Sequence, residues 1–348
     1  MADRVYLDHN ATAPLRPEAR AAMGAAMDLV GNPSSVHAEG RAAKGMMERA
    51  RAEILTALGA EDCDLVFVSG ATEGAALACA RQGLHCAPVE HDAITAWCQS
   101  DLPVDTRGAV HVADPGHTAL QSANSETGVL QDLPEGLALV DLTQSFGKMP
   151  VAFSWTGARV GLVSGHKIGG PKGIGAIVMR RGTDLAAQIK GGGQEMGWRS
   201  GTENLVGISG FAAAATAAQR DLEAGRWERV AEIRNILETS LHSGASETIF
   251  VGKGTARLAN TVCAVSPGWK GETQVMQMDL AGYAVSAGSA CSSGKVKPSR
   301  VLRAMGFDEN DAACALRVSI GLETTEEDVL RFSEAWLKAR NRHMARAA

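Results

Sequence analysis

Aromatic residues, paired cysteines and long apolar runs are scarce or absent in this chain of 348 residues. Phe, Trp and Tyr together make up 4% of it, and its seven cysteines form no CxxC pair. An odd number of unpaired cysteines argues against a zinc site or a disulfide scaffold and favours a reducing compartment. No apolar run approaches the roughly 20 residues that a membrane-spanning helix needs. The opening stretch MADRVYLDHN lacks the apolar core of a secretory signal.

An excess of positive charge is also missing. The formal net charge is −5, and no basic stripe runs along the sequence, so direct binding to nucleic acid is not expected. Hydrophobic residues make up 45% of the chain and charged residues 21%, which is ordinary for a folded protein. We therefore expect a cytoplasmic globular protein without a membrane or nucleic-acid partner.

The apolar pattern predicts strands that alternate with helices. Apolar residues between positions 42 and 58 recur with helical spacing, and Gly59 ends that helix. Apolar strands are expected at 65–68, before Asp141, before Lys167 and at 174–179. This alternation predicts an α/β fold whose sheet is mostly parallel.

The length of the chain favours more than one domain. The pattern changes after about residue 222, which predicts a large domain over 14–222 and a smaller α/β domain made of 1–13 and 223–348. The last helix is expected to begin at a capping box formed by Thr324 and Glu327.

Polar residues follow three of the predicted strands, at Ser69–Thr72, at Asp141 with Gln144, and at Ser164–Lys167. Ligands of open parallel sheets bind beyond the carboxyl ends of the strands. The turn SGATEG can cradle an anion at a helix N-terminus, or it can be a plain turn in which Thr72 is the N-cap. Asp141 can cap the next helix, or it can hold a ring nitrogen protonated.

Lys167 suits covalent chemistry better than nucleotide binding. A nucleotide P-loop needs GxxxxGK[ST], whereas the Gly-Lys pairs of this chain precede Met149, Gly254 and Val296. A lysine at a strand end, near an anion cradle and a carboxylate, can form a Schiff base with the aldehyde of pyridoxal 5′-phosphate. Without the other two motifs, the sequence would favour an ordinary surface lysine at position 167.

Several stretches of the chain together resemble the cysteine desulfurases, which are class V, fold-type I pyridoxal phosphate enzymes. The matching stretches occur in the family's order and are YLDHNATAPLRPEA, GNPSSVHAEG, FVSGATEG, VEHDAI, ANSETG, VDLTQSFGK, SGHKIGGPKGIGAIV, GGGQEMGWRSGTEN, AVSAGSACSSG and LRVSIG. The resemblance implies a fold-type I transferase with a large domain, a small domain and a long loop for the catalytic cysteine.

The resemblance also implies the cofactor, pyridoxal 5′-phosphate, and the residues that hold its ring. Lys167 would bind its aldehyde, Asp141 would pair with the ring nitrogen, and Gln144 would bond the ring hydroxyl. His91 would stack on the ring and take part in catalysis.

The phosphate group of the cofactor would be held by backbone and hydroxyl groups. The resemblance gives this role to Ala71, Thr72, Ser164 and His166. Thr202 would contact the phosphate bound by a partner subunit, which implies a homodimer. His91 and His166 can also be structural histidines.

Three further positions concern the substrate. By resemblance, Asn124 and Arg317 would face the carboxylate of L-cysteine, and Cys291 would accept the sulfur as a persulfide. Asn124 can instead shape a turn, and Arg317 can be a surface ion-pair residue. Lys295 and Lys297 near Cys291 favour its thiolate. The other six cysteines lie in apolar or helical patterns and are expected to pack in the interior.

The chain departs from the family in two places. The region between Arg81 and Asn124 is shorter, and Ser125 follows Asn124 where the family often has a second asparagine. The implied activity is desulfuration of L-cysteine to L-alanine, followed by transfer of sulfur to an acceptor such as an iron–sulfur scaffold or a tRNA-thiolation relay. The alternatives are selenocysteine lyase, aminotransferase or epimerase activity, or a non-catalytic homologue that only binds partners.

Overall fold

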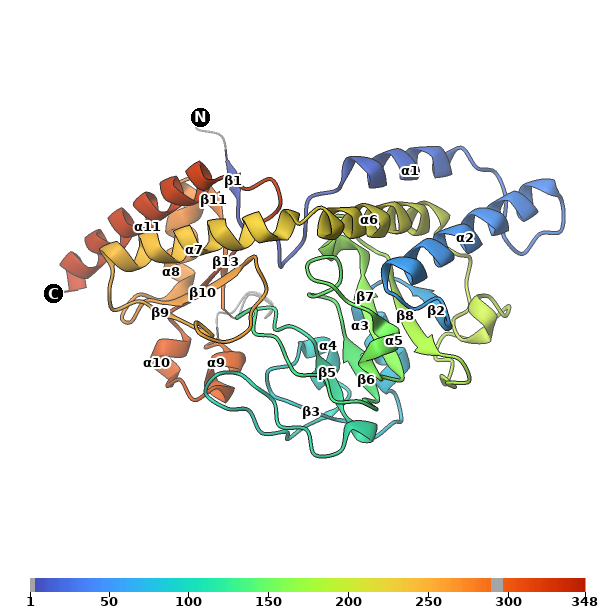
Figure 1. Cartoon of the computed structure of the whole chain (residues 1–348), viewed down its shortest axis with the longest axis horizontal. Coiled ribbons are helices and arrows are strands. Elements are labelled where there is room, and N and C mark those ends of the chain that lie inside the picture. Colours follow the sequence, from blue (N-terminus) through green and yellow to red (C-terminus); the bar gives the residue numbers. More distant parts are fainter. Residues whose placement is uncertain (1–3, 289–296, 348) are drawn as a thin grey trace.

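The computed structural model describes residues 4–288 and 297–347. Two sheets lie side by side, and each is packed against helices (Figure 1). Helices α6 (Leu205–Glu223) and α7 (Arg226–Gly244) run end to end across both halves, α6 along the larger sheet and α7 along the smaller one (Figure 1). The α/β fold that the sequence predicts is confirmed.

The larger sheet has the strand order β2-β8-β7-β6-β5. Its strands are β2 (Cys63–Val68), β5 (Ala119–Gln121), β6 (Leu139–Asp141), β7 (Val160–Ser164) and β8 (Gly175–Arg180). The pairs β5–β6 and β6–β7 are parallel, whereas β8 is antiparallel to both of its neighbours. The reversal of β8 follows from its connection, because only a short 3₁₀ turn and a loop separate it from β7, without a crossover helix.

Helices pack on both faces of this sheet. The helices of this half, besides α6, are α1 (Pro17–Met27), α2 (Ala38–Ala57), α3 (Ala71–Cys79), α4 (Asp92–Thr95) and α5 (Phe153–Thr156). One apolar core includes residues of α1, α2 and α6, and another includes residues of α3. A short parallel ribbon of β3 (His85–Cys86) and β4 (Gln99–Ser100) lies beside them. The predicted helix end at Gly59 is confirmed, since its φ is +56° and α2 stops at Ala57.

The smaller sheet is antiparallel, with the order β12-β13-β10-β9. Its strands are β9 (Ile249–Phe250), β10 (Thr261–Val265), β12 (Ser286–Ala287) and β13 (Ala315–Ser319). The remaining helices are α8 (Gly271–Leu280), α9 (Arg300–Ala304), α10 (Glu309–Ala312) and α11 (Glu326–Ala347). Trp269 and Trp336 pack together in the core beneath α7 and α11, with ring centroids 5.4 Å apart.

The capping box of α11 lies one residue later than the sequence analysis predicts. The hydroxyl of Thr325 accepts a hydrogen bond from the Asp328 N–H at 3.1 Å, and the Asp328 carboxylate accepts one from the Thr325 N–H at 2.9 Å. Thr324 instead accepts a hydrogen bond from the Gly321 N–H. The prediction of Thr324 and Glu327 was therefore wrong in register, because two adjacent threonines each have an acidic residue three positions later.

The N-terminal segment, residues 5–16, joins the two halves. Strand β1 (Val5–Tyr6) pairs with β11 (Tyr283–Ala284) of the smaller half. The Ala13 N–H then donates to the His166 carbonyl at 2.9 Å, and the Arg16 N–H donates to the Gly169 carbonyl at 2.8 Å. Residues 8–12 consequently lie over the carboxyl end of β7.

Among the described residues, every helix is too short or too polar to cross a membrane.

Candidate active site

The carboxyl ends of the parallel strands bring the predicted site residues to one edge of the larger sheet. Asp141 is the last residue of β6 and pairs with Leu162 of β7. Ser164 ends β7, and a 3₁₀ turn over Gly165–Lys167 then positions the lysine. This is the edge at which open α/β sheets bind ligands.

The amine of Lys167 lies against the N-terminal segment. Its Nζ donates to the Asn10 carbonyl at 2.6 Å and to the Ala11 carbonyl at 2.9 Å. The Gln144 Nε2 donates to the same Asn10 carbonyl at 3.0 Å. Lys167 and Gln144, which the sequence analysis assigns to one cofactor, are thus joined through a single backbone oxygen.

The turn before α3 is built for close approach of backbone groups. Gly70 is the N-cap of α3, which begins at Ala71, so Thr72 is the second residue of the helix and does not cap it. A side chain at Gly175 would lie 2.9 Å from the Gly70 Cα, and this clash explains why glycine is needed there. The Ser164 hydroxyl lies near the same turn, 3.9 Å from the place of a Cβ on Gly70. Helix N-termini of this kind favour anions.

His166 adds a buried ring nitrogen to this turn. Its Nδ1 is buried and has no hydrogen-bond partner among the described residues. Burial, with a contribution from Lys167, lowers the pKa of His166 to about 4, so its ring is neutral at pH 7. A buried ring nitrogen without a partner is costly unless a ligand satisfies it. The hydroxyls, the α3 N-terminus and this nitrogen therefore fit the phosphate of pyridoxal phosphate.

Asp141 lies at the end of β6, whereas His91 lies at the exposed start of α4. The Asp141 carboxylate accepts a hydrogen bond from the Thr143 N–H at 2.8 Å. His91 is exposed and caps α4, where its Nδ1 accepts a hydrogen bond from the Ala93 N–H at 3.1 Å. Glu90 before it is buried, and burial, with Asp141 nearby, raises the pKa of Glu90 well above its usual range.

Arg317 is not a surface residue. Its guanidinium is buried in β13 and forms an ion pair of 2.8 Å with Asp8 of the N-terminal segment. It also donates to the Ser125 carbonyl at 3.3 Å, while its Nε has no partner among the described residues. Asp8 accepts a second hydrogen bond from Ser286 at 2.8 Å. The guanidinium is therefore held in one orientation, and its Nε–H has no acceptor among the described residues.

Asn124 has its side chain engaged within the turn that it shapes. Its Oδ1 accepts hydrogen bonds from the N–H groups of Glu126 and Thr127, both at 2.9 Å. Its Nδ2 donates to the Val89 carbonyl at 3.0 Å. These bonds match the turn-forming alternative from the sequence.

Of two further predicted residues, the structure describes the position of Thr202 only. Thr202 is exposed, in the loop before α6. Cys291 lies outside the described residues, as do Lys295 and most of the loop around them. The other six cysteines form no disulfide, and all are buried except Cys98, which is partly buried. The prediction that these six are packing residues is confirmed.

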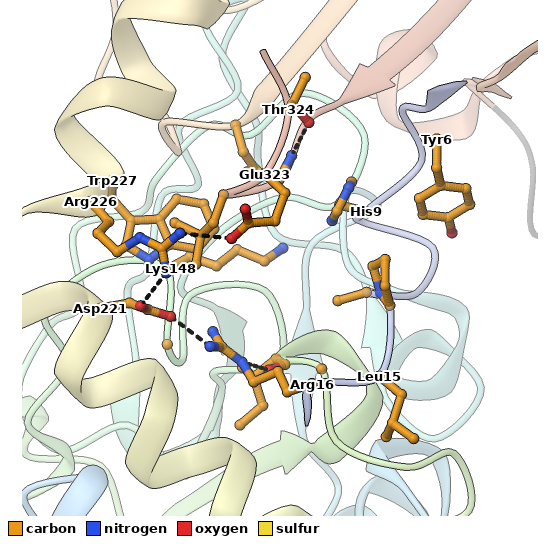
Figure 2. A pocket seen from close by; sticks show the side chains of 18 of the residues that line it. Tyr6, His9, Leu15, Arg16, Lys148, Asp221, Arg226, Trp227, Glu323 and Thr324 are labelled. Atoms are coloured by element: carbon orange, nitrogen blue, oxygen red, sulfur yellow. Dashed lines mark hydrogen bonds and ion pairs between the residues drawn. The ribbon is translucent and has the colours of Figure 1, made fainter. Parts of the chain in front are cut away.

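A pocket of about 690 Å³ adjoins this edge of the sheet. Lys167 and Lys148 are among the residues that line it. Its wall is completed by the N-terminal segment, the α6–α7 junction and residues 321–331. Figure 2 shows the row of ion pairs Arg16–Asp221–Arg226–Glu323 along one side.

Sequence reasoning missed two residues at the centre of the site, Asn10 and Lys148. Asn10 is 1% exposed and Lys148 is 4% exposed. Both lie inside stretches that resemble the family, but neither follows a strand pattern. The sequence offered one signal for Lys148, which is that this lysine stands within the apolar stretch after Gln144.

Comparison with known proteins agrees with this geometry. The profile of the family described as Aminotransferase class-V matches residues 5–96 and 113–332. The chain belongs to the class-V aminotransferase family. Within that family it is 36% identical to a protein named cysteine desulfurase from Cereibacter sphaeroides, over 95% of this chain and 94% of the relative. It is 34% identical to "Cysteine desulfurase IscS" from Dictyoglomus turgidum, over 94% of this chain and 92% of the relative.

A solved structure of a class-V relative has the same fold over the whole length. The NifS-like protein from Rickettsia africae superposes with a TM-score of 0.86 and 30% identity, and covers 97% of this chain and 99% of that one. The resemblance to cysteine desulfurases on which the sequence analysis relied is therefore confirmed.

Proposed function

We propose that this chain is a pyridoxal phosphate-dependent cysteine desulfurase. The observation that supports this most is the position of Lys167 after β7, with Asp141 at the end of the adjacent strand β6. The turn before α3, together with Ser164 and His166, supplies the anion site that the cofactor's phosphate needs. The names of the full-length relatives point to the same activity.

Different residues of this chain bind the aldehyde, the ring and the phosphate of the cofactor. Lys167 binds the aldehyde, Asp141 keeps the ring nitrogen protonated, and Gln144 donates to the ring oxygen. Thr72, Ser164 and His166 hold the phosphate, and Ala71 provides backbone close to it. Pyridoxal phosphate, when bound, would supply an electron sink for the α-carbon of the substrate.

Four side chains act on the substrate or hold it and the cofactor ring during the reaction. The amine of Lys167 would take the proton from the α-carbon of L-cysteine. Arg317 faces the substrate carboxylate, and His91 stacks on the ring. The Cys291 thiolate attacks the substrate sulfur, so an S–S bond forms, the C–S bond breaks, and L-alanine leaves. An acceptor protein then takes the sulfur from the persulfide.

One assay tests the proposal. Purified protein is loaded with pyridoxal phosphate and given L-cysteine and a thiol reductant, and sulfide and alanine are both measured. Equal amounts of the two products are expected. Lys167→Ala should lose the visible absorbance of the lysine-bound cofactor as well as turnover. A variant that keeps that absorbance after dialysis contradicts the assignment of Lys167, and alanine without sulfide points to another class-V reaction.

A further inference from the structure

Lys148 is a buried lysine in the turn that follows Gln144. Its side chain is 4% exposed, and its Nζ donates to the Gln144 Oε1 at 2.7 Å and to the Asn10 Oδ1 at 3.0 Å. Burial, with Lys167 and Arg317 nearby, holds the pKa of Lys148 well below its ordinary range. The ammonium and the neutral amine can both donate to two acceptors, so these bonds form in either state.

Gln144 has only one orientation that satisfies its two neighbours. The Lys148 amine donates to the Gln144 Oε1 in either protonation state, and the Asn10 carbonyl can only accept. The amide oxygen must therefore face Lys148, and the amide nitrogen must face Asn10, as the distances of 2.7 Å and 3.0 Å require. The nitrogen carries two hydrogens, and the Asn10 carbonyl accepts one of them. The second hydrogen can reach a ligand.

Asn10 is itself fixed from several sides, which makes it a firm anchor. Its Oδ1 also accepts a hydrogen bond from the Asn260 Nδ2 at 3.0 Å. Its Nδ2 donates to the Thr261 hydroxyl at 2.9 Å and to the Ser125 carbonyl at 3.1 Å, and its backbone N–H donates to the Ser319 hydroxyl at 2.9 Å. A fully bonded buried network of this kind holds its members in one arrangement.

We propose that Lys148 is a positioning residue that fixes the Gln144 carboxamide with an N–H group directed to the ring oxygen of the bound cofactor. This inference rests on the proposed function, because that function assigns the ring oxygen to Gln144. Loss of Lys148 would let the amide rotate and present its oxygen to the ring oxygen, where two acceptors repel each other.

The expected effect is on cofactor affinity. Lys148→Met keeps an unbranched, flexible side chain but removes the donor, and it should raise the dissociation constant for pyridoxal phosphate about tenfold, the loss expected for one buried hydrogen bond. Lys148→Gln can still donate to one acceptor and should recover part of the affinity. Lys44→Met removes an exposed lysine from α2 and should leave the affinity unchanged.

A double-mutant cycle separates positioning through Gln144 from an independent structural role. Apo forms of the wild type, Lys148→Met, Gln144→Met and the double variant are titrated with pyridoxal phosphate. The double variant should bind no more weakly than Gln144→Met. The pH midpoint of the visible absorbance of the bound cofactor should move in the same direction in both single variants.

Two outcomes overturn the inference alone. One is a double variant whose loss equals the product of the two single losses, and the other is equal affinity in Lys148→Met and the wild type. If Lys148→Met does not fold, as judged by circular dichroism, Lys148→Gln replaces it in the cycle under the same criteria. A wild-type protein that binds no pyridoxal phosphate overturns the proposed function, and this inference with it.

Discussion

Arg317 of β13 and Asp8 of the N-terminal segment form a buried ion pair at 2.8 Å, with side chains 4% and 16% exposed. The two residues are 309 positions apart in the sequence. The pair fixes the guanidinium that the proposed function directs at the substrate carboxylate.

Removal of Asp8 should therefore affect both stability and substrate binding. Asp8→Ala leaves Arg317 buried without its counter-ion and should lower the free energy of unfolding by about 3 kcal/mol. KM for L-cysteine should rise more than kcat falls, because the orientation of the guanidinium is lost. Denaturant unfolding and steady-state kinetics measure the two effects.

Asp279 provides a matched control, since its pair with Arg4 is exposed at 57% and 58%. Asp279→Ala should change the stability by less than about 1 kcal/mol. Similar losses in the two variants would contradict the special role given to Asp8.

The active site should require two subunits if Thr202 acts on the partner's cofactor. Inactive Lys167→Ala and inactive Thr202→Ala proteins are mixed, partly unfolded and refolded together. About a quarter of the wild-type activity should return, since half of the dimers are mixed and each mixed dimer has one intact site. Full activity of a protein that is monomeric by light scattering would exclude this arrangement.

Thiol reactivity should be concentrated on Cys291. Hydrogen bonding with Cys79 is the main reason that the pKa of Cys98 is raised to about 12, and burial raises the pKa of Cys263 and Cys314. Thiols of this kind are poor nucleophiles at pH 7.5. Brief exposure to L-cysteine, persulfide labelling and peptide mapping should find the label on Cys291.

The Cys291→Ser variant supplies the control for this experiment. It should keep the visible absorbance of the cofactor but release almost no sulfide. Label on Cys98, or unchanged sulfide release by the Ser variant, would remove Cys291 from the mechanism.

Glu126 should make the stability depend on pH. Burial raises the pKa of Glu126 from 4.5 to about 7, despite a 2.6 Å hydrogen bond from the Ser299 hydroxyl. Between these two pH values the folded state binds more protons than the unfolded state, so stability falls as the pH rises. The loss should be complete above pH 7 and amount to about 2 kcal/mol.

Chemical denaturation at a series of pH values measures this effect against Glu126→Gln. The amide cannot ionise, so the difference between variant and wild type should grow from pH 4.5 to pH 7 in favour of the variant. A difference that does not change over this range would show that the folded carboxyl titrates normally.

The parts of this fold that sequence predicts are those set by local pattern. Apolar runs located the strands before Asp141 and Lys167, and the order of turn residues located the start of α3. The reversed direction of β8 depends on the absence of a crossover helix, which the pattern of alternating elements did not reveal.

The predicted site was incomplete for a different reason. The environment of Asn10 is made by residues such as Thr261 and Ser319, which are far away in the sequence. No periodic pattern reports such contacts, and the same holds for Lys148, whose burial depends on its bonds to Asn10 and Gln144. The register error at α11 arose because spacing alone cannot choose between adjacent threonines.

The bonds of Asn10 also bear on how the protein matures during translation. Residues 14–222 leave the ribosome well before the partners of Asn10 in β10 and β13, so the larger sheet can fold while the N-terminal segment still lacks its anchors in these two strands. The hydrogen bond from Asn10 to Ser319 can form only when nearly the whole chain has been made. A nascent chain stalled before residue 319 would consequently hold Asn10, whose carbonyl accepts a hydrogen bond from Lys167, less firmly than the finished protein does. We therefore expect the cofactor to bind late in the synthesis of the polypeptide.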